Sequence, residues 1–372
     1  MLTFDFHGLA ISRLGMGGMR FPMKDEAIDF DATKQILDHA MANGINYYDT
    51  AYGYHGGQSE VVLGKLLTAY PRDSYYLADK FPGYDVSTFA RKEEIFEEQL
   101  RRCQTEYFDF YLCHNVCEKN IDAFLDPTYG LIPYLLEQKK AGKIRHFGFS
   151  THGSLKVIRR FLEACGGEME FCQIQLNWLD YSLQNAEEKI RLISSFGIPV
   201  WVMEPLRGGR LVNLSEAHRE RLKTLRPGEN IPAWSFRYLQ SLPEVGVILS
   251  GMSTLSQLQE NIATFSEDKP TTATETAVLY GMAEEMKRSI ALPCTACRYC
   301  VEYCPQELDI PRLLALYNEN AVTEGGDVKA ALSEIPAEKH PSSCLSCRSC
   351  EEVCPQQIRI SEAMERFSSL MN

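Results

Sequence analysis

Residues 30–54 read FDATKQILDHAMANGINYYDTAYGY, and the pair of elements that they predict recurs along most of the chain. Apolar residues at helical spacing over 30–43 indicate an amphipathic helix. The β-rich run 45–49 follows directly after Gly44 and predicts a short strand that ends in polar side chains. Helices that alternate with strands are typical of proteins built around a parallel sheet.

Eight β-rich runs of this kind lie between Leu14 and Ser250, with helical stretches between them. The predicted strands cover residues 14–16, 45–49, 75–80, 109–114, 144–150, 171–176, 199–204 and 245–250. The clearest predicted helices cover residues 30–43, 87–104, 131–142 and 155–164. Eight strands separated by helices predict an α/β protein with a (β/α)8 TIM barrel. A doubly wound sheet is the alternative, but its Gly-rich loop is matched only weakly, by residues 15–18, and no helix follows them.

Three of the predicted strands end in side chains that are suited to chemistry. In a TIM barrel the active site lies at the carboxyl ends of the strands. The second predicted strand ends at Asp49 and leads to Tyr54. The third ends in Lys80 and the fourth in His114. We expect these four side chains to meet around one opening of the barrel.

This group of residues is suited to hydride transfer. A carbonyl that accepts a hydride needs a proton on its oxygen, and an isolated tyrosine, with a pKa of about 10, is a poor donor near neutral pH. A lysine beside Tyr54 lowers that pKa, and Asp49 would fix and neutralise the lysine. His114 would donate a hydrogen bond to the carbonyl oxygen. Each residue alone has an ordinary structural explanation, such as a turn or a solvated surface, so the prediction rests on their joint placement.

Two segments near the carboxyl end repeat one cysteine pattern. They read CTACRYCVEYCP over residues 294–305 and CLSCRSCEEVCP over residues 344–355. Both are C-x2-C-x2-C-x3-C-P, the bacterial ferredoxin pattern, so they predict two [4Fe–4S] clusters. The fourth cysteine of each segment usually reaches the other cluster. The predicted ligands are Cys294, Cys297, Cys300 and Cys354 for one cluster, and Cys344, Cys347, Cys350 and Cys304 for the other.

Structural zinc sites are the alternative, since four thiolates also suit zinc. Zinc ribbons use two separated C-x2-C pairs, so a repeated triplet followed by C-P favours iron–sulfur clusters. Helical patterns accompany the cysteines over residues 310–320, 327–333 and 361–370. The segment resembles the helical two-cluster ferredoxin-type domains built into larger oxidoreductases. We therefore predict a barrel domain over 1–285 and a small α-helical cluster domain over 286–372.

Segments of the barrel part resemble the aldo-keto reductases, namely YYDTAYGY over residues 47–54, LADK over 77–80 and DFYLCH over 109–114. The resemblance implies a TIM barrel, a nicotinamide cofactor and a catalytic tetrad of Asp49, Tyr54, Lys80 and His114. It also implies that Ser150 and Gln173 bind the cofactor carboxamide. Other implied cofactor contacts are Leu206 and Gly208 in the loop over the pyrophosphate, and Gly251 and Asn261 after the eighth strand.

Two positions depart from the family pattern. Met203 stands where an aromatic residue commonly stacks on the nicotinamide. The loop 250–261 has no Lys or Arg, although a 2′-phosphate is usually held by such cations. The cofactor is therefore NAD or NADP. Arg207 and Arg210 are candidates either to replace the missing cation or to bind a substrate carboxylate. FMN is a further candidate cofactor, because a nicotinamide gives two electrons and a [4Fe–4S] cluster takes one.

The composition narrows the class of partner. The net charge is −12, and no basic stripe with interleaved aromatic residues indicates nucleic-acid binding. No apolar run is long enough to predict a membrane span or a signal peptide, so we expect a cytoplasmic protein. We expect a small carbonyl or alcohol substrate and a redox partner protein. The favoured function is an NAD(P)-dependent oxidoreductase of aldo-keto reductase type whose two clusters transfer electrons. The alternative is an electron-transfer subunit or redox sensor whose barrel binds a cofactor without its own carbonyl turnover.

Overall fold

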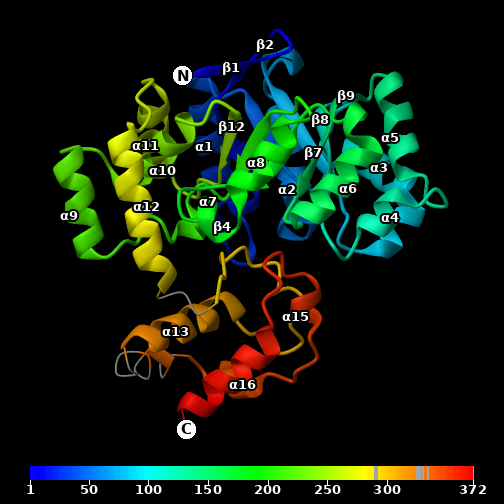
Figure 1. Cartoon of the computed structure of the whole chain (residues 1–372). Helices are drawn as coiled ribbons and strands as arrows, with labels where there is room; N and C mark the ends of the chain where they lie inside the picture. Colours follow the sequence, from blue (N-terminus) through cyan, green and yellow to red (C-terminus); the bar gives the residue numbers. More distant parts are fainter. Residues whose placement is uncertain (289–291, 324–327, 329–330, 333–334, 372) are drawn as a thin grey trace. The chain divides into compact units, whose positions relative to one another are not determined.

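The chain forms two compact units in the computed structural model (Figure 1). Residues 1–288, 292–323, 328, 331–332 and 335–371 are described. The first unit comprises Met1–Pro205 and Arg226–Ala273, and the second comprises Leu206–Leu225 and Thr274–Asn372. The boundary that we predicted between residues 285 and 286 falls within helix α12 (Ala273–Arg288), and it stays a prediction.

The first unit is a closed barrel of eight parallel strands, which confirms the predicted fold class. Around the barrel the order is β10-β11-β12-β3-β6-β7-β8-β9. The strands are β3 (Leu14–Gly17), β6 (Tyr47–Asp49), β7 (Tyr76–Phe81), β8 (Phe108–Val116), β9 (Ile144–Thr151), β10 (Cys172–Gln175), β11 (Val200–Met203) and β12 (Val245–Ser250). Each predicted strand overlaps one of them. The barrel closes where Ser250 of β12 pairs with Met16 of β3.

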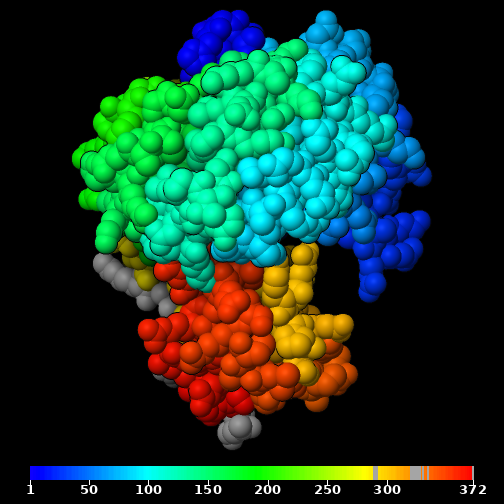
Figure 2. Space-filling view, turned by 90° about the vertical axis from the view of Figure 1, so that its right-hand side faces the viewer, coloured from blue at the N-terminus to red at the C-terminus, as the bar shows by residue number. Residues whose placement is uncertain are grey.

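Helices follow the strands and cover the outside of the barrel (Figure 1). They are α1 (Phe30–Ala42), α2 (Gln58–Leu67), α3 (Lys92–Arg102), α4 (Ile121–Leu125), α5 (Leu131–Lys140), α6 (Leu155–Cys165), α7 (Asp180–Leu183), α8 (Ala186–Ser194), α10 (Ile231–Gln240) and α11 (Leu255–Phe265). The predicted helix 87–104 is two elements, the 3-10 helix η4 (Val86–Arg91) and α3. In the space-filling view the cyan-to-green residues of this outer layer form a continuous face (Figure 2).

An amino-terminal hairpin, which the sequence did not lead us to expect, closes one end of the barrel. It pairs β1 (Thr3–Phe6) with β2 (Leu9–Ser12) through His7 and Gly8, which both have positive φ. Phe6 packs 5.6 Å from Phe110 and 5.1 Å from Trp201, measured between ring centroids. Both partners lie near the amino ends of their strands, so this aromatic cluster fills that end. The carboxyl ends of the strands are therefore left for a site.

The second unit is helical. Besides α12 it contains α9 (Glu216–Leu225), α13 (Ile310–Thr323), α15 (Ser349–Glu352) and α16 (Ile360–Met371). Its core joins Leu313 and Leu314 of α13 with Met364 and Phe367 of α16. Two of the three helices predicted near the cysteines are thus present, whereas most of 327–333 lies outside the described residues. In the part of the chain that is described, no helix is long and apolar enough to cross a membrane.

Candidate active site

Four predicted catalytic residues meet at the carboxyl ends of β6, β7 and β8. The Lys80 Nζ lies 2.5 Å from Asp49 Oδ1 and 2.6 Å from the carbonyl oxygen of Thr50. The same nitrogen lies 3.5 Å from the Tyr54 hydroxyl and 4.9 Å from the centre of its ring. The His114 ring stands edge-on to Tyr54, with 6.0 Å between the centroids. The barrel therefore gathers side chains that are separated by up to sixty-odd residues in the sequence.

Burial decides the charges of this group. Lys80 is fully buried beside Asp49, whose pKa is raised by burial, an effect that the lysine charge opposes. Burial and then the charge of Lys80 lower the pKa of His114 well below its usual value. His114 is therefore a neutral imidazole at neutral pH, and one of its ring nitrogens carries a proton that it can donate. A neutral donor beside a lysine–carboxylate pair is suited to binding a carbonyl oxygen.

A left-handed turn places Tyr54. The 3-10 helix η2 (Tyr54–Gly57) continues with positive φ at His55, Gly56 and Gly57 before α2 begins. Glycine tolerates this conformation at no steric cost, which explains two glycines at this point of the sequence. Before the turn, a Cβ on Gly53 would lie 2.1 Å from the hydroxyl oxygen of Tyr84. Tyr84 in turn packs against His114, with 5.7 Å between the ring centroids, so it belongs to the same site.

The residues predicted to bind the carboxamide lie side by side. Ser150 of β9 and Gln173 of β10 are register partners, and both are buried. The Ser150 hydroxyl oxygen accepts a hydrogen bond from the backbone nitrogen of Asn115, at 2.8 Å. Among the described residues, the buried Oε1 of Gln173 has no hydrogen-bond partner. A buried acceptor of this kind normally has a donor, and the amide of a nicotinamide would supply one. The residues present therefore fit the cofactor.

The two predicted contacts after the eighth strand lie next to a cation that sequence reasoning missed. Asn261 donates to the Ser250 hydroxyl at 3.2 Å. A Cβ on Gly251 would lie 2.9 Å from Arg20, which follows the first barrel strand. The Ser253 hydroxyl donates to the Arg20 carbonyl oxygen at 2.7 Å. The loop itself has no cation, but closure of the barrel places the Arg20 side chain against it.

Leu206 and Gly208 belong to the second unit, where they lie beside the first cysteine segment. The Arg207 guanidinium is 1% exposed and donates to the carbonyl oxygens of Pro293 and Cys294, both at 3.2 Å. Gly208 has φ +65°, and a Cβ there would lie 2.1 Å from the carbonyl oxygen of Thr295. This loop, which we expected to cover a pyrophosphate, therefore packs on the cysteine segment 293–295.

The eight predicted cluster ligands lie near one another, and their division between two clusters stays a prediction. Burial and then the charges of Cys297, Cys294 and Cys354 raise the pKa of the Cys300 thiol. Burial, Glu351 and then Cys344, Cys304 and Cys347 raise the pKa of Cys350 to about 12. A cavity is lined by four of these sulfurs, those of Cys304, Cys344, Cys347 and Cys350. A set of four converging thiols is the donor set that a [4Fe–4S] cluster needs, so these residues fit the clusters.

The repeat between the two cysteine segments extends to backbone conformation. Ala296 and Arg298 in the first segment have positive φ, as do Ser346 and Arg348 at the equivalent positions of the second. A non-glycine residue in this region costs about 1 kcal/mol or more. The same cost at matching positions indicates that the two segments are bent in the same way.

This fold and this constellation define a TIM-barrel oxidoreductase with an attached iron–sulfur domain. A family model described as "Aldo/keto reductase family" matches residues 13–277. The chain belongs to the aldo/keto reductase family. A second model, described as "4Fe-4S dicluster domain", matches residues 293–358 and decides between iron–sulfur clusters and zinc in favour of the clusters.

Relatives and solved structures agree with this assignment. The chain is 27% identical to the L-galactose dehydrogenase of Arabidopsis thaliana over 70% of its own length and 86% of the relative. It is 26% identical to the NADH-specific methylglyoxal reductase of Escherichia coli, over 75% of its length and 97% of the relative. The holo structure of the aldo-keto reductase AKR11C1 from Bacillus halodurans superposes with a TM-score of 0.62 at 25% identity, covering 76% of this chain and 95% of that one.

Proposed function

We propose that this protein is an NAD(P)-dependent reductase of small carbonyl compounds, or the corresponding alcohol dehydrogenase in reverse, with Tyr54 as its proton donor. The observation that carries the proposal is the buried Lys80 ammonium, which contacts both Asp49 Oδ1 and the Tyr54 hydroxyl. A cation in that place stabilises the phenolate that forms when the tyrosine gives up its proton.

Each residue of the tetrad has its own role in the proposed reaction. The bound nicotinamide supplies the hydride that reaches the carbonyl carbon. The carbonyl oxygen takes the proton from the Tyr54 hydroxyl, so that an alcohol is formed and the tyrosine becomes a phenolate. Lys80 stabilises that phenolate, and Asp49 holds the lysine side chain in place. The neutral His114 donates a hydrogen bond to the same substrate oxygen and fixes its orientation.

The proposed cofactor contacts are the residues that the sequence predicts. Ser150 and Gln173 would hold the carboxamide, and the free acceptor on Gln173 supports this assignment. Gly251, Asn261, Leu206 and Gly208 remain predicted contacts to the rest of the nucleotide. The Escherichia coli relative is named for its use of NADH. A Klebsiella pneumoniae aldo-keto reductase of the same fold, at 21% identity and a TM-score of 0.61, was solved with NADP and acetate. Arg20 beside Gly251 supports binding of NADP as well as NAD.

Replacement of Tyr54 by Phe tests the proposal. The ring and its packing remain while the proton donor is lost, so kcat for reduction of a small aldehyde should fall by about a hundredfold or more. Tyr70→Phe is the matched control, because its hydroxyl bonds to Asp38 on the outside of the barrel. Unchanged turnover in Tyr54→Phe would exclude this mechanism.

A second function, electron transfer between the cofactor and the clusters, is favoured by the packing of Arg207 and Gly208 on residues 293–295. A change of two electrons to one requires an intermediary, and FMN is the candidate that we predict. Anaerobic addition of NADH or NADPH, without substrate, tests this function through the visible absorbance of the clusters. Bleaching supports an electron path to the clusters. Intact absorbance in the presence of carbonyl turnover would leave the clusters to a structural role or to a partner protein.

The setting of the protein remains a prediction. We expect a cytoplasmic enzyme that is served by a redox partner protein, because the iron–sulfur domain belongs to a class that commonly exchanges electrons with other proteins. Purification under anaerobic conditions, followed by identification of any protein that elutes with the chain, tests the partner.

A further inference from the structure

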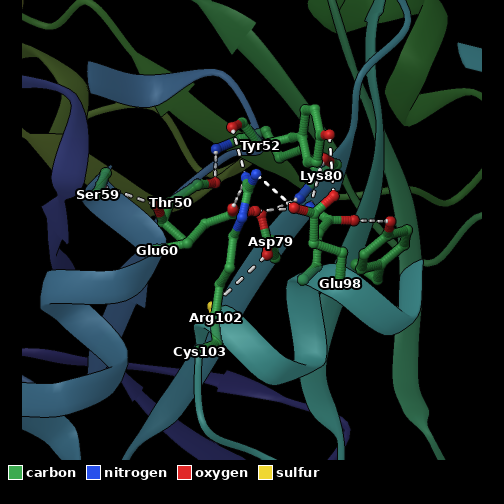
Figure 3. Close-up of polar contacts among 11 residues, drawn as sticks. Thr50, Tyr52, Ser59, Glu60, Asp79, Lys80, Glu98, Arg102 and Cys103 are labelled. Atoms are coloured by element: carbon green, nitrogen blue, oxygen red, sulfur yellow. Dashed lines mark hydrogen bonds and ion pairs between the residues drawn. The ribbon is translucent and has the colours of Figure 1, made fainter. Parts of the chain in front are cut away.

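A pair of carboxyl groups lies buried directly behind the catalytic lysine. Asp79 of β7 and Glu60 of α2 are both 0% exposed. The two carboxyls are hydrogen-bonded to each other. Figure 3 shows the side chains of Glu60, Arg102 and Asp79 close together, with Lys80 beside Asp79. The reaction of Tyr54 does not use either carboxyl.

Every oxygen of this pair has a further partner. The Oδ1 of Asp79 accepts from the backbone nitrogen of Lys80 at 2.8 Å, and its Oδ2 accepts from the Cys103 thiol at 3.7 Å. The Oε1 of Glu60 accepts from Gln99 at 3.0 Å, and the same amide nitrogen donates to the carbonyl oxygen of Lys80. The Oε2 of Glu60 accepts from Arg102 at 2.8 Å. The pair therefore holds the backbone nitrogen of Lys80 directly, and its carbonyl oxygen through Gln99.

The same network reaches the turn that carries Tyr54. The Arg102 guanidinium contacts the Tyr52 carbonyl oxygen at 3.5 Å and lies 4.7 Å from the Tyr52 ring. A Cβ on Gly57 would lie 2.8 Å from Arg102. Tyr52 and Gly57 flank Tyr54 on either side, so Arg102 supports both ends of that turn. Asp79, Glu60 and Arg102 thus connect the two segments that carry the catalytic lysine and tyrosine.

The pair shares one proton. Two carboxylates in contact cannot both be ionised, and a hydrogen bond between them needs a proton on one. Arg102 pairs with Glu60, so Glu60 is the partner that keeps its charge. Burial and then the charge of Glu60 raise the pKa of Asp79 well above its usual value.

Of the other groups that face Asp79, the Lys80 ammonium opposes this shift but does not reverse it. Cys103 and Tyr111 are neutral, because burial raises the pKa of each well above its usual value. The Lys80 ammonium already pairs with Asp49. Asp79 therefore has no cation of its own.

We propose that Asp79 keeps its proton in the working enzyme and, through its hydrogen bond to Glu60, acts as a positioning residue for Lys80 and the Tyr54 turn. A protonated Asp79 leaves Asp49 as the carboxylate that balances the lysine. An ionised Asp79 would add a second negative charge near the position where the Tyr54 phenolate forms and would oppose its formation. The role in catalysis rests on the proposed function of Tyr54, whereas the protonation of Asp79 does not.

Asp79→Asn tests the protonation without any measurement of activity. Asparagine keeps the shape, the acceptor oxygen for Lys80 and a donor for Glu60. The infrared band of a protonated carboxyl group should be present in the full-length wild-type chain at pH 7 and lost in Asp79→Asn. The control is Asp109→Asn, since Asp109 is equally buried but pairs with Arg72 and Arg145, and its replacement should remove no such band. A wild-type spectrum without the band would overturn the proposal.

Unfolding measured against pH gives a second readout. The native chain keeps the Asp79 proton while the unfolded chain loses it above about pH 4. As the pH rises, the equilibrium constant for unfolding of the wild type should therefore increase about tenfold per pH unit relative to that of Asp79→Asn. This increase should stop when the pH reaches the pKa of Asp79 in the native chain. A difference between the two proteins that does not change with pH would contradict the proposal.

Steady-state kinetics then test the positioning role. Asp79→Asn should keep kcat within about threefold of the wild type at pH 7, and its activity should extend further into alkaline pH. Asp79→Ala, which removes both the acceptor for Lys80 and the partner of Glu60, should lower kcat by about tenfold or more. If Asp79→Asn falls to the level of Asp79→Ala, an ionised Asp79 is needed and the proposal is wrong. If the wild type shows no carbonyl turnover, the proposed function fails while the infrared test still decides the protonation.

Discussion

His114 shows how burial fixes the chemistry of a single side chain. Its pKa is lowered well below the usual value by burial and by Lys80, so the ring gains no proton until the pH is well below 6.5. His114→Gln, which keeps a donor but cannot titrate, should lower kcat/KM by about tenfold, and His114→Ala by about a hundredfold. Neither change should move the acid limb of the pH profile between pH 5 and 9. An acid limb that disappears in His114→Gln would show that the histidine titrates during turnover.

Arg20 provides a test of cofactor choice. Its side chain lies on Gly251 and forms a 3.5 Å ion pair with Glu204. We expect Arg20→Met to raise KM for NADPH by about tenfold and to change KM for NADH less than threefold, because a charge-assisted contact to phosphate contributes about 1.5–3 kcal/mol. Lys24→Met is the control, since Lys24 is an exposed cation four residues away. Equal increases in KM for NADPH and NADH would indicate that Arg20 binds the pyrophosphate that both nucleotides share. Unchanged KM values would indicate that Arg20 contacts Glu204 and neither nucleotide.

The sequence predicts some of these residues and hides others for a physical reason. Asp49, Lys80 and His114 were found because each ends a predicted strand, and strand ends share one edge of a barrel. Arg20 was missed because its partner Gly251 is remote in the chain. They meet only because β12 pairs with β3 when the barrel closes. Asp79 looked like an ordinary strand residue, since the sequence does not show that Glu60 of α2 packs behind it.

The strands of the barrel were predictable and the hairpin in front of them was not. Most residues of the barrel strands are buried, and apolar or aromatic residues recur along them, which gives a strong local signal. The strands β1 and β2 have four residues each, and their pairing depends on a turn through His7 and Gly8. Their contribution lies in aromatic contacts to Phe110 and Trp201, which local sequence does not show.

The hairpin should contribute to stability and not to catalysis. Phe6 is 3% exposed and packs on Phe110, His146, Phe171 and Trp201. Phe6→Ala should therefore lower the free energy of unfolding by about 3–5 kcal/mol, measured by urea titration of the barrel. KM and kcat should stay within twofold of the wild type, because the aromatic residues around Phe6 lie at the end of the barrel opposite the catalytic tetrad. Phe196→Ala, which changes a ring that is 39% exposed, should cost about 0.5 kcal/mol. If Phe6→Ala kept the stability of the wild type but lost catalytic activity, the prediction that the hairpin acts only on stability would be wrong.

The sequence predicts that the chain divides into a barrel and a cluster domain. It does not predict which segments of the chain belong to each of them. The cysteine repeat marks the carboxyl part clearly. The second unit, however, also contains Leu206–Leu225, which lies between the seventh and eighth strands of the barrel in the sequence. No local pattern identifies that segment, because its membership depends on contacts such as Arg207 to Pro293 and Cys294.

These contacts place positive charge beside the first predicted cluster. Burial raises the pKa of the Cys294 thiol, and the charges of Arg207 and Arg210 oppose that rise. A cluster that gains an electron becomes more negative, so a nearby cation stabilises its reduced form. Arg207→Gln should therefore lower the reduction potential of the first cluster by about 40 mV, which corresponds to about 1 kcal/mol for one electron. The second cluster should change much less.

An anaerobic redox titration followed by electron paramagnetic resonance measures both potentials in one sample. The matched control is Arg221→Gln, because Arg221 belongs to the same unit but pairs with Glu285 away from the cysteines. If Arg207→Gln shifts the two clusters equally, the effect is one of folding, because a local charge acts mainly on its nearest cluster. If neither shifts while the clusters stay intact, Arg207 serves only to hold the backbone of Pro293 and Cys294. A shift confined to one cluster would identify that cluster as the one bound by Cys294.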